Sequence, residues 1–140
     1  MLLNKLRKAF IHWRFISVME AILDTNFILS CLRKNIDLVN ELSNMGFRIV
    51  VPREVLEELK DLRLGRTSRE NRLLIDIALE ILKDKKIKRI KLGTKSVDEG
   101  LIKKGREGVY IASLDNAIKR EVANKIIISN ARNGLEIKRD

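Results

Sequence analysis

Carboxylates at the ends of apolar runs are the residues in this sequence that are best placed to do chemistry. Asp24 directly follows the apolar run at 21–23, and Asp115 stands three residues after the run at 109–112. Two further pairs of acids lie near the starts of expected helices: Glu57 with Glu58, and Asp98 with Glu99. Ligands of open parallel α/β sheets bind beyond the carboxyl ends of the strands, so we expect these acids at one rim of the molecule.

Such a cluster suits a hard divalent cation. Mg²⁺ and Mn²⁺ prefer oxygen ligands, and Mg²⁺ keeps several waters while using only a few protein carboxylates. Two such ions about 3.5–4 Å apart activate a water and stabilise the leaving oxygen in phosphodiester hydrolysis. The composition is consistent with chemistry by metal-bound carboxylates, because His12 is the only histidine and Cys31 the only cysteine. A His-pair ribonuclease, a multi-His metal site and a Cys-rich zinc site are therefore excluded.

Each acid also has a purely structural interpretation. Asp24 could cap the helix that follows it, and Asp98 and Asp115 lie where acids stabilise helix N-termini. Glu57 and Glu58 belong to a charged helix, in which an exposed carboxylate is the default. The joint placement near one rim is what favours a chemical role.

The elements that must position these acids alternate between strands and helices. Strands are predicted at 21–23, 47–51, 87–92, 109–112 and 126–128. Helices are predicted to begin at Asn26 and to cover 37–45, 52–63, 68–83, 96–104 and 115–123. Strands separated by helical crossovers pair in parallel, which predicts a three-layer α/β/α sandwich with a parallel five-stranded sheet. Neither GxGxxG nor GxxxxGK[ST] is present, so a dinucleotide or P-loop site has no support.

Around these acids the sequence resembles the PIN-domain nuclease family, from about Glu20 to the C-terminus. Its first motif is similar to residues 22–27, ILDTNF, with Asp24 as the metal-binding acid and Asn26 in support. Its second motif is similar to residues 51–59, VPREVLEEL. The functional acid of that motif directly precedes a leucine, which selects Glu58 over Glu57.

The two remaining motifs of the family resemble later parts of the chain. Residues 96–102, SVDEGLI, are similar to the third motif, with Asp98 as the acid and Glu99 as a helper. Residues 111–115, IASLD, are similar to the fourth, with Asp115 as the acid and Ser113 as a hydrogen-bond donor beneath the site.

The resemblance implies a PIN-like sheet order of 3-2-1-4-5, which makes the first and fourth strands neighbours. It also implies Mg²⁺ or Mn²⁺ as cofactor, cleavage of single-stranded RNA to a 5′-phosphate and a 3′-hydroxyl, and a homodimer. The spacing and the tail at 128–132 look most like the branch that processes small-subunit ribosomal RNA. The single cysteine departs from relatives in that branch that carry a zinc-binding extension.

The net charge of +10, from 29 basic and 19 acidic residues, favours a polyanionic partner such as nucleic acid. Residues 1–18 hold four basic residues and no acid, so the remainder still carries +6. Two basic groups are candidate RNA contacts near the acids: Arg63, Arg66, Arg69 and Arg72 in one, and Lys103, Lys104 and Arg106 in the other. The basic run at 83–91 surrounds the third strand, where lysines protect a sheet edge from aggregation, so we discount it.

Residues 1–18 are expected to form a basic amphipathic N-terminal extension, ahead of a PIN-like domain at 19–140. Leu2, Leu6, Phe10 and Trp13 recur at helical spacing. Three interpretations stay open: a helix packed on the body or on a second subunit, a loose basic arm, or a non-native segment with Met19 as the natural start. Charged residues interrupt every apolar run, which argues against a signal peptide and a membrane span.

The leading hypothesis is a cytoplasmic, metal-dependent endoribonuclease acting on single-stranded RNA, such as an rRNA precursor, in rRNA processing or RNA turnover. One alternative is the toxin of a toxin–antitoxin pair, held by a small antitoxin. Another is an RNA-binding or ribosome-assembly scaffold with little catalysis.

Overall fold

A computed structural model describes residues 2–5 and 19–140. The amphipathic helix expected in the N-terminal extension, and the choice among its three interpretations, therefore lie mostly outside the described residues. Within the described ranges, no helix combines the length and apolar character needed to cross a membrane.

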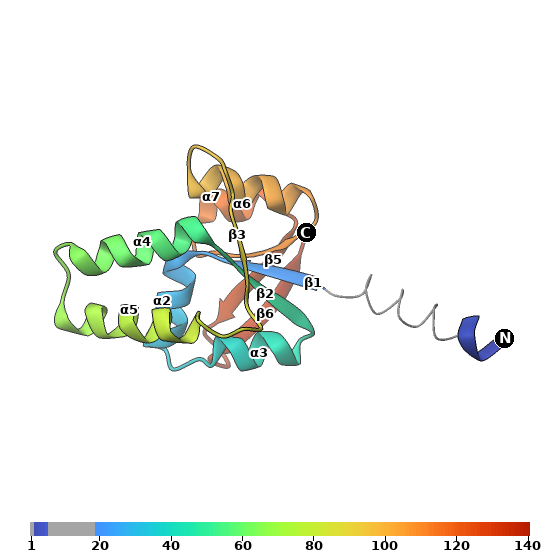
Figure 1. The fold of residues 1–140 in the computed structure, drawn as a ribbon, viewed down its shortest axis with the longest axis horizontal. Coiled ribbons are helices and arrows are strands. Elements are labelled where there is room, and N and C mark those ends of the chain that lie inside the picture. The colour runs from blue at the N-terminus through green and yellow to red at the C-terminus, as the bar shows by residue number, and fades with distance from the viewer. Residues whose placement is uncertain (1, 6–18) are drawn as a thin grey trace.

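The centre of the fold is a six-stranded sheet in the order β3-β2-β1-β4-β5-β6 (Figure 1). Its strands are β1 (Met19–Leu23), β2 (Phe47–Pro52), β3 (Lys88–Ile90), β4 (Tyr110–Ala112), β5 (Asn124–Ser129) and β6 (Gly134–Arg139). The first five strands pair in parallel, with β1 between β2 and β4. The predicted order of these five strands is confirmed.

Strand β6 corrects the prediction of a five-stranded, wholly parallel sheet. It pairs with β5 in antiparallel fashion, from Ser129 opposite Gly134 to Asn124 opposite Arg139. The turn between them needs a left-handed residue, which Asn133 supplies at φ 47°. Leu135 then fills the core with no exposed surface. An Asn-Gly pair followed by alternating apolar residues is a hairpin signal, and the sequence prediction overlooked it.

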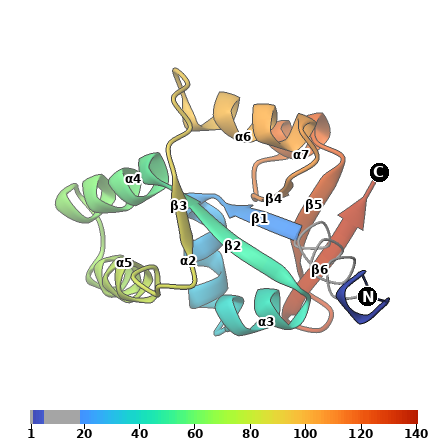
Figure 2. The same cartoon turned by 45° about the vertical axis from the view of Figure 1, so that its right-hand side comes forward.

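Helices cover both faces of the sheet (Figures 1 and 2). They are α2 (Thr25–Arg33), α3 (Leu38–Asn44), α4 (Arg53–Leu64), α5 (Arg69–Ile81), α6 (Val97–Arg106) and α7 (Asn116–Glu121). The alternation of side chains along β1 divides the core in two, because Ala21 and Leu23 pack with α2 to α5 while Ile22 packs with α6 and α7. The three-layer α/β/α class is therefore as predicted.

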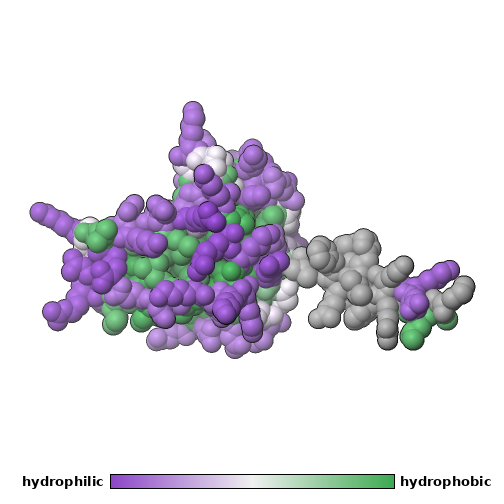
Figure 3. Space-filling model, viewed as in Figure 1, coloured by the Kyte–Doolittle hydropathy of each residue, from purple (hydrophilic) through white to green (hydrophobic). Residues whose placement is uncertain are grey.

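Helices α4 and α5 form a hairpin that extends from the sheet (Figure 1). Glu58 of α4 lies near Asp24 and Thr25 at the start of α2. Val55 and Leu59 of α4 and Ile75 of α5 are fully buried between these helices and the sheet. On the face drawn in Figure 3, apolar side chains lie among charged ones over this hairpin. Leu64, at its tip, is 81% exposed.

Candidate active site

Asp24 stands at the carboxyl end of the central strand β1. Its backbone N–H donates to the carbonyl oxygen of Ala112 at 2.9 Å, which adds a last rung to the ladder between β1 and β4. Its Oδ1 accepts from the N–H of Thr25 at 2.9 Å and so caps α2. Helix α2 therefore begins at Thr25 and not at Asn26 as predicted, because Asp24 fills the N-cap position.

Ser113 ties Asp24 to Asp115. The Ser113 hydroxyl donates to Oδ2 of Asp24 at 3.0 Å and accepts from the N–H of Asp115 at 3.1 Å. Oδ1 of Asp115 accepts from the N–H of Ala117 at 2.8 Å, so Asp115 caps α7. Asp24 and Asp115 therefore both cap helices, as their structural interpretations predicted. The hydrogen bonds that form these caps also hold the two side chains in position.

Glu54 positions the chain that leads into α6 and Asp98. Its carboxylate accepts from the N–H of Leu92 at 3.1 and 3.0 Å and from the N–H of Gly93 at 3.0 Å. Burial alone would raise the pKa of Glu54, but these amides outweigh burial and lower that pKa below its ordinary value. Sequence reasoning missed this role, although Glu54 lies inside the second motif.

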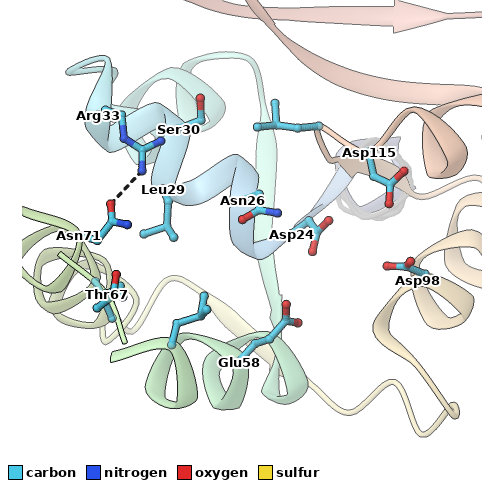
Figure 4. A pocket seen from close by; sticks show the side chains of 13 residues that line it. Asp24, Asn26, Leu29, Ser30, Arg33, Glu58, Thr67, Asn71, Asp98 and Asp115 are labelled. Atoms are coloured by element: carbon cyan, nitrogen blue, oxygen red, sulfur yellow. Dashed lines mark hydrogen bonds between the residues drawn. The ribbon is translucent and has the colours of Figure 1, made fainter. Parts of the chain in front are cut away.

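The four principal acids line one cavity of about 580 Å³ (Figure 4). Asp24 comes from the end of β1, Glu58 from α4, Asp98 from α6 and Asp115 from the start of α7. Their carboxylates point into the same space (Figure 4). Glu57, on the same helix as Glu58, is not among the lining residues.

Loss of solvent and repulsion by neighbouring acids raise the pKa values of two of these acids, Asp24 and Glu58. Burial raises the pKa of Asp24 above its ordinary value, and the negative charges of Asp98 and Asp115 raise it further. Hydrogen bonds from Ser113 and Thr25 oppose the rise by favouring the ionised form. A bound cation would remove the same repulsion.

The pKa of Glu58 is raised for similar reasons. Partial loss of solvent raises the pKa of Glu58, and the charges of Asp24 and Asp98 add to that rise. The Thr25 side chain lies near enough to lower this pKa partly. Yet the Thr25 hydroxyl is the one buried side-chain polar atom in the described residues without a hydrogen-bond partner. The Thr25 hydroxyl therefore lies near Glu58, but Thr25 is not among the residues that line the cavity.

The end of the cavity away from the acids is polar and carries a positive charge. Arg33 donates to Oδ1 of Asn71 at 3.2 Å, which joins α2 to α5 (Figure 4). Ser30 and Thr67 line the same end. The sequence held a signal for part of this set, because Asn26, Ser30 and Arg33 are spaced i, i+4 and i+7 on one face of α2.

The other predicted residues divide between this cavity and other surfaces. Asn26 lines the cavity with the acids, whereas Glu99 lines a separate cavity with Lys103 and Arg106. None of the predicted RNA contacts on α4, α5 and α6 lines the carboxylate cavity. Three of them form ion pairs: Arg63 with Asp76, Lys104 with Glu107, and Arg106 with Glu121.

Comparisons with known proteins agree with this fold. The profile of the family described as "PIN like domain" matches residues 21–130. A solved structure of the PIN domain endonuclease Utp24 superposes with a TM-score of 0.69 at 23% sequence identity, covering 86% of this chain and 92% of that chain. No curated protein sequence matches. The family match spans both strand ends that carry Asp24 and Asp115, and the chain therefore belongs to the PIN-like domain family of nucleases.

Proposed function

We propose that this protein is a divalent-metal-dependent endoribonuclease that hydrolyses phosphodiesters of single-stranded RNA. The observation that carries the proposal is the convergence of Asp24, Glu58, Asp98 and Asp115 on one cavity. Asp98, Asp115 and Glu58 are exposed at its rim, so a polymer can reach them from outside without threading an end. That accessibility favours cleavage within a chain.

The donor set fits Mg²⁺ or Mn²⁺. All four acids offer the hard oxygens that these ions prefer. Among the described residues, no three acidic, histidine or cysteine side chains are positioned as they stand to hold an ion. Mg²⁺ fills most of its coordination with water and uses few protein carboxylates. When bound, such an ion lowers the pKa of a water and stabilises the leaving oxygen.

The residues of the chain hold the site ready for that ion. Hydrogen bonds from Ser113 and the Thr25 amide favour the ionised form of Asp24 and oppose the burial that raises its pKa. Ser113 also fixes Asp115, so two acids keep their separation through one hydroxyl. Arg33, at the other end of the cavity, supplies the cation that a neighbouring phosphate would contact.

For the biological role, we propose maturation of small-subunit ribosomal RNA. The support is the motif spacing and the tail at 128–132, which resemble that branch of the family. A ribosome-assembly partner and a homodimer belong to the same proposal. Cleavage of a structured rRNA precursor in preference to tRNA would support it over the toxin hypothesis, and growth arrest on expression that a neighbouring antitoxin relieves would support the toxin.

The test is cleavage of a labelled single-stranded RNA in Mn²⁺, with EDTA as the blank. Asp24→Asn and Asp115→Asn should abolish cleavage while circular dichroism shows an intact fold, and Asp61→Asn is the control at an exposed acid outside the cavity. Glu58→Gln should lose activity and Glu57→Gln, one residue away, should keep it. The wild-type products should carry a 5′-phosphate and a 3′-hydroxyl. If both aspartate variants cut as fast as the parent, the carboxylate–metal mechanism is wrong.

A further inference from the structure

A second cavity, of about 660 Å³, has five basic side chains among its thirteen lining residues. We call it the basic cleft. Its cations are Lys34, Lys119, Arg120, Lys125 and Lys138, and its one acid is Asp140. They come from the end of α2, from α7 and from the hairpin of β5 and β6. None of these residues belongs to the basic groups that the sequence singled out.

The basic cleft adjoins the carboxylate cavity directly. Ser30 and Leu114 line both cavities and form the ridge between them. Asp115 lines the acidic side of that ridge and Asn116, the next residue, lines the basic side. Leu114 is 39% exposed and so offers an apolar surface on the ridge itself. A chain that crosses Leu114 passes from one cavity into the other.

Two lysines of the cleft lie opposite each other on neighbouring strands, an arrangement that β-sheets usually avoid. Lys125 on β5 lies directly opposite Lys138 on β6, so both side chains share one face. Like charges at directly opposite positions destabilise a sheet. Lys125 is only 4% exposed and forms an ion pair with Asp140, which offsets one of the two charges. A local arrangement that opposes stability is expected where function requires it.

Of the remaining basic side chains of the cleft, Lys34 is held by hydrogen bonds, whereas Lys119 and Arg120 form no ion pair within the described chain. Nζ of Lys34 donates to Oδ1 of Asn130 at 2.7 Å, and Nδ2 of Asn133 donates to the carbonyl oxygen of Lys34 at 3.1 Å. These bonds fix the end of α2 against the β5–β6 turn. Lys119 and Arg120 form no ion pair with the rest of the described chain. Their charges are therefore free for a ligand.

We propose that the basic cleft binds the phosphate backbone of the single-stranded RNA on one side of the scissile bond, so that the strand crosses Leu114 into the carboxylate cavity. The inference rests on the proposed nuclease function. A polyanion is repelled by four carboxylates, and the adjoining cations supply the attraction that overcomes this repulsion. Continuity with the carboxylate cavity is what favours RNA over an acidic protein partner.

The experiment compares Lys119→Ala/Arg120→Ala with a control that removes the same charge elsewhere. The control is Lys85→Ala/Lys86→Ala, in the turn before β3, at the opposite edge of the sheet and at the amino ends of its strands. The probe is a fluorescein-labelled oligouridylate of about 16 nucleotides, long enough to cover both cavities. Affinity is measured by anisotropy in EDTA over a salt series, and cleavage kinetics are measured in Mn²⁺.

The cleft variant should bind the oligonucleotide about tenfold or more weakly. Its slope of log affinity against log salt should fall by about 0.7 for each phosphate that the variant no longer neutralises, whereas the control should keep the wild-type slope. In cleavage, the cleft variant should raise KM and leave kcat unchanged. Lys138→Gln, at a separate position in the cleft, should weaken binding in the same direction.

The outcomes separate the two proposals. If wild type cleaves RNA but the cleft variants match the control in affinity, slope and KM, the cleft proposal is wrong and the nuclease stands; the cleft then serves another ligand, such as an acidic protein. If wild type binds RNA through the cleft in EDTA but never cleaves it in Mn²⁺, the nuclease proposal fails and the cleft remains an RNA-binding surface. If the wild-type protein binds no RNA at all, the proposal that the cleft binds RNA is also wrong.

Discussion

The hydroxyl of Ser113 is small, but its removal should be among the most damaging single changes to the site. Ser113 is 1% exposed and bonds both Asp24 and the Asp115 amide. Ser113→Ala loses a hydrogen bond to a charged group, about 1.5–3 kcal/mol, and leaves a backbone N–H without its acceptor, about 1–3 kcal/mol. We expect the free energy of unfolding to fall by about 3 kcal/mol. With a urea dependence of ~1.5 kcal/mol/M, the unfolding midpoint should fall by about 2 M.

The assay is urea unfolding of the metal-free protein, followed by circular dichroism at two pH values. Ser113 stabilises the ionised form of Asp24, whose pKa burial already raises, so the variant should raise that pKa further. The difference in stability between wild type and variant should therefore have its full size above the raised pKa of Asp24. It should become smaller as the pH falls through that pKa. Ser129→Ala is the matched control, because Ser129 is also buried but makes no side-chain hydrogen bond within the described chain. Equal midpoints for the two alanine variants would refute the reasoning.

Three further changes test other parts of the structure. Asp24→Asn should raise the melting temperature of the metal-free protein at pH 7, because burial disfavours the charge of Asp24. This gain in melting temperature should vanish as the pH falls below the raised pKa of Asp24. A lower melting temperature of the variant at pH 7 would contradict the prediction. Glu54→Ala should lose about 1–2 kcal/mol by freeing the amides of Leu92 and Gly93. Since the pKa of Glu54 is lowered from 4.5, that difference in denaturant midpoint should be present at neutral pH and disappear in acid. Gly105→Ala should lower the free energy of unfolding by about 1–3 kcal/mol, measured by thermal unfolding. A Cβ at this position would lie 2.2 Å from Cγ1 of Val122. Gly65→Ala, whose Cβ would meet only ordinary contacts from 3.5 Å outward, should change stability little.

The sequence predicted the parallel part of the fold because its physical signals are local. Apolar runs such as 21–23 and 47–51 must be buried strands, and the helices between them carry their own caps and apolar faces. The strand order of β1 to β5 came from the family resemblance, since no local pattern states which strands are neighbours. Strand β6 was missed because Leu135 and Ile137 alternate over too short a stretch to stand out, and the preceding Asn-Gly turn was overlooked.

The acids of the candidate site were accessible to sequence reasoning, but their supports were not. A carboxylate after a buried strand has a predictable place at the sheet rim, which is how Asp24 and Asp115 were found. The contacts of Glu54 with Leu92 and Gly93 join segments 38 and 39 residues apart, and nothing local indicates them. The basic cleft was hidden for the same reason, because Lys125 and Lys138 come together only when the missed strand β6 is in place.

The neighbouring positions of β1 and β4 decide when the site can form. Asp24 and Ser113 are 89 residues apart in sequence, yet one hydrogen bond joins them. Contacts at such separation close a long loop, which costs entropy and slows folding. Strands β1, β2 and β3 can associate while the chain is being synthesised, but Asp115 joins the other acids only after most of the domain has emerged. A nascent chain therefore carries an incomplete set of acids, and under the proposed function it would gain the ability to cut RNA only with the finished fold.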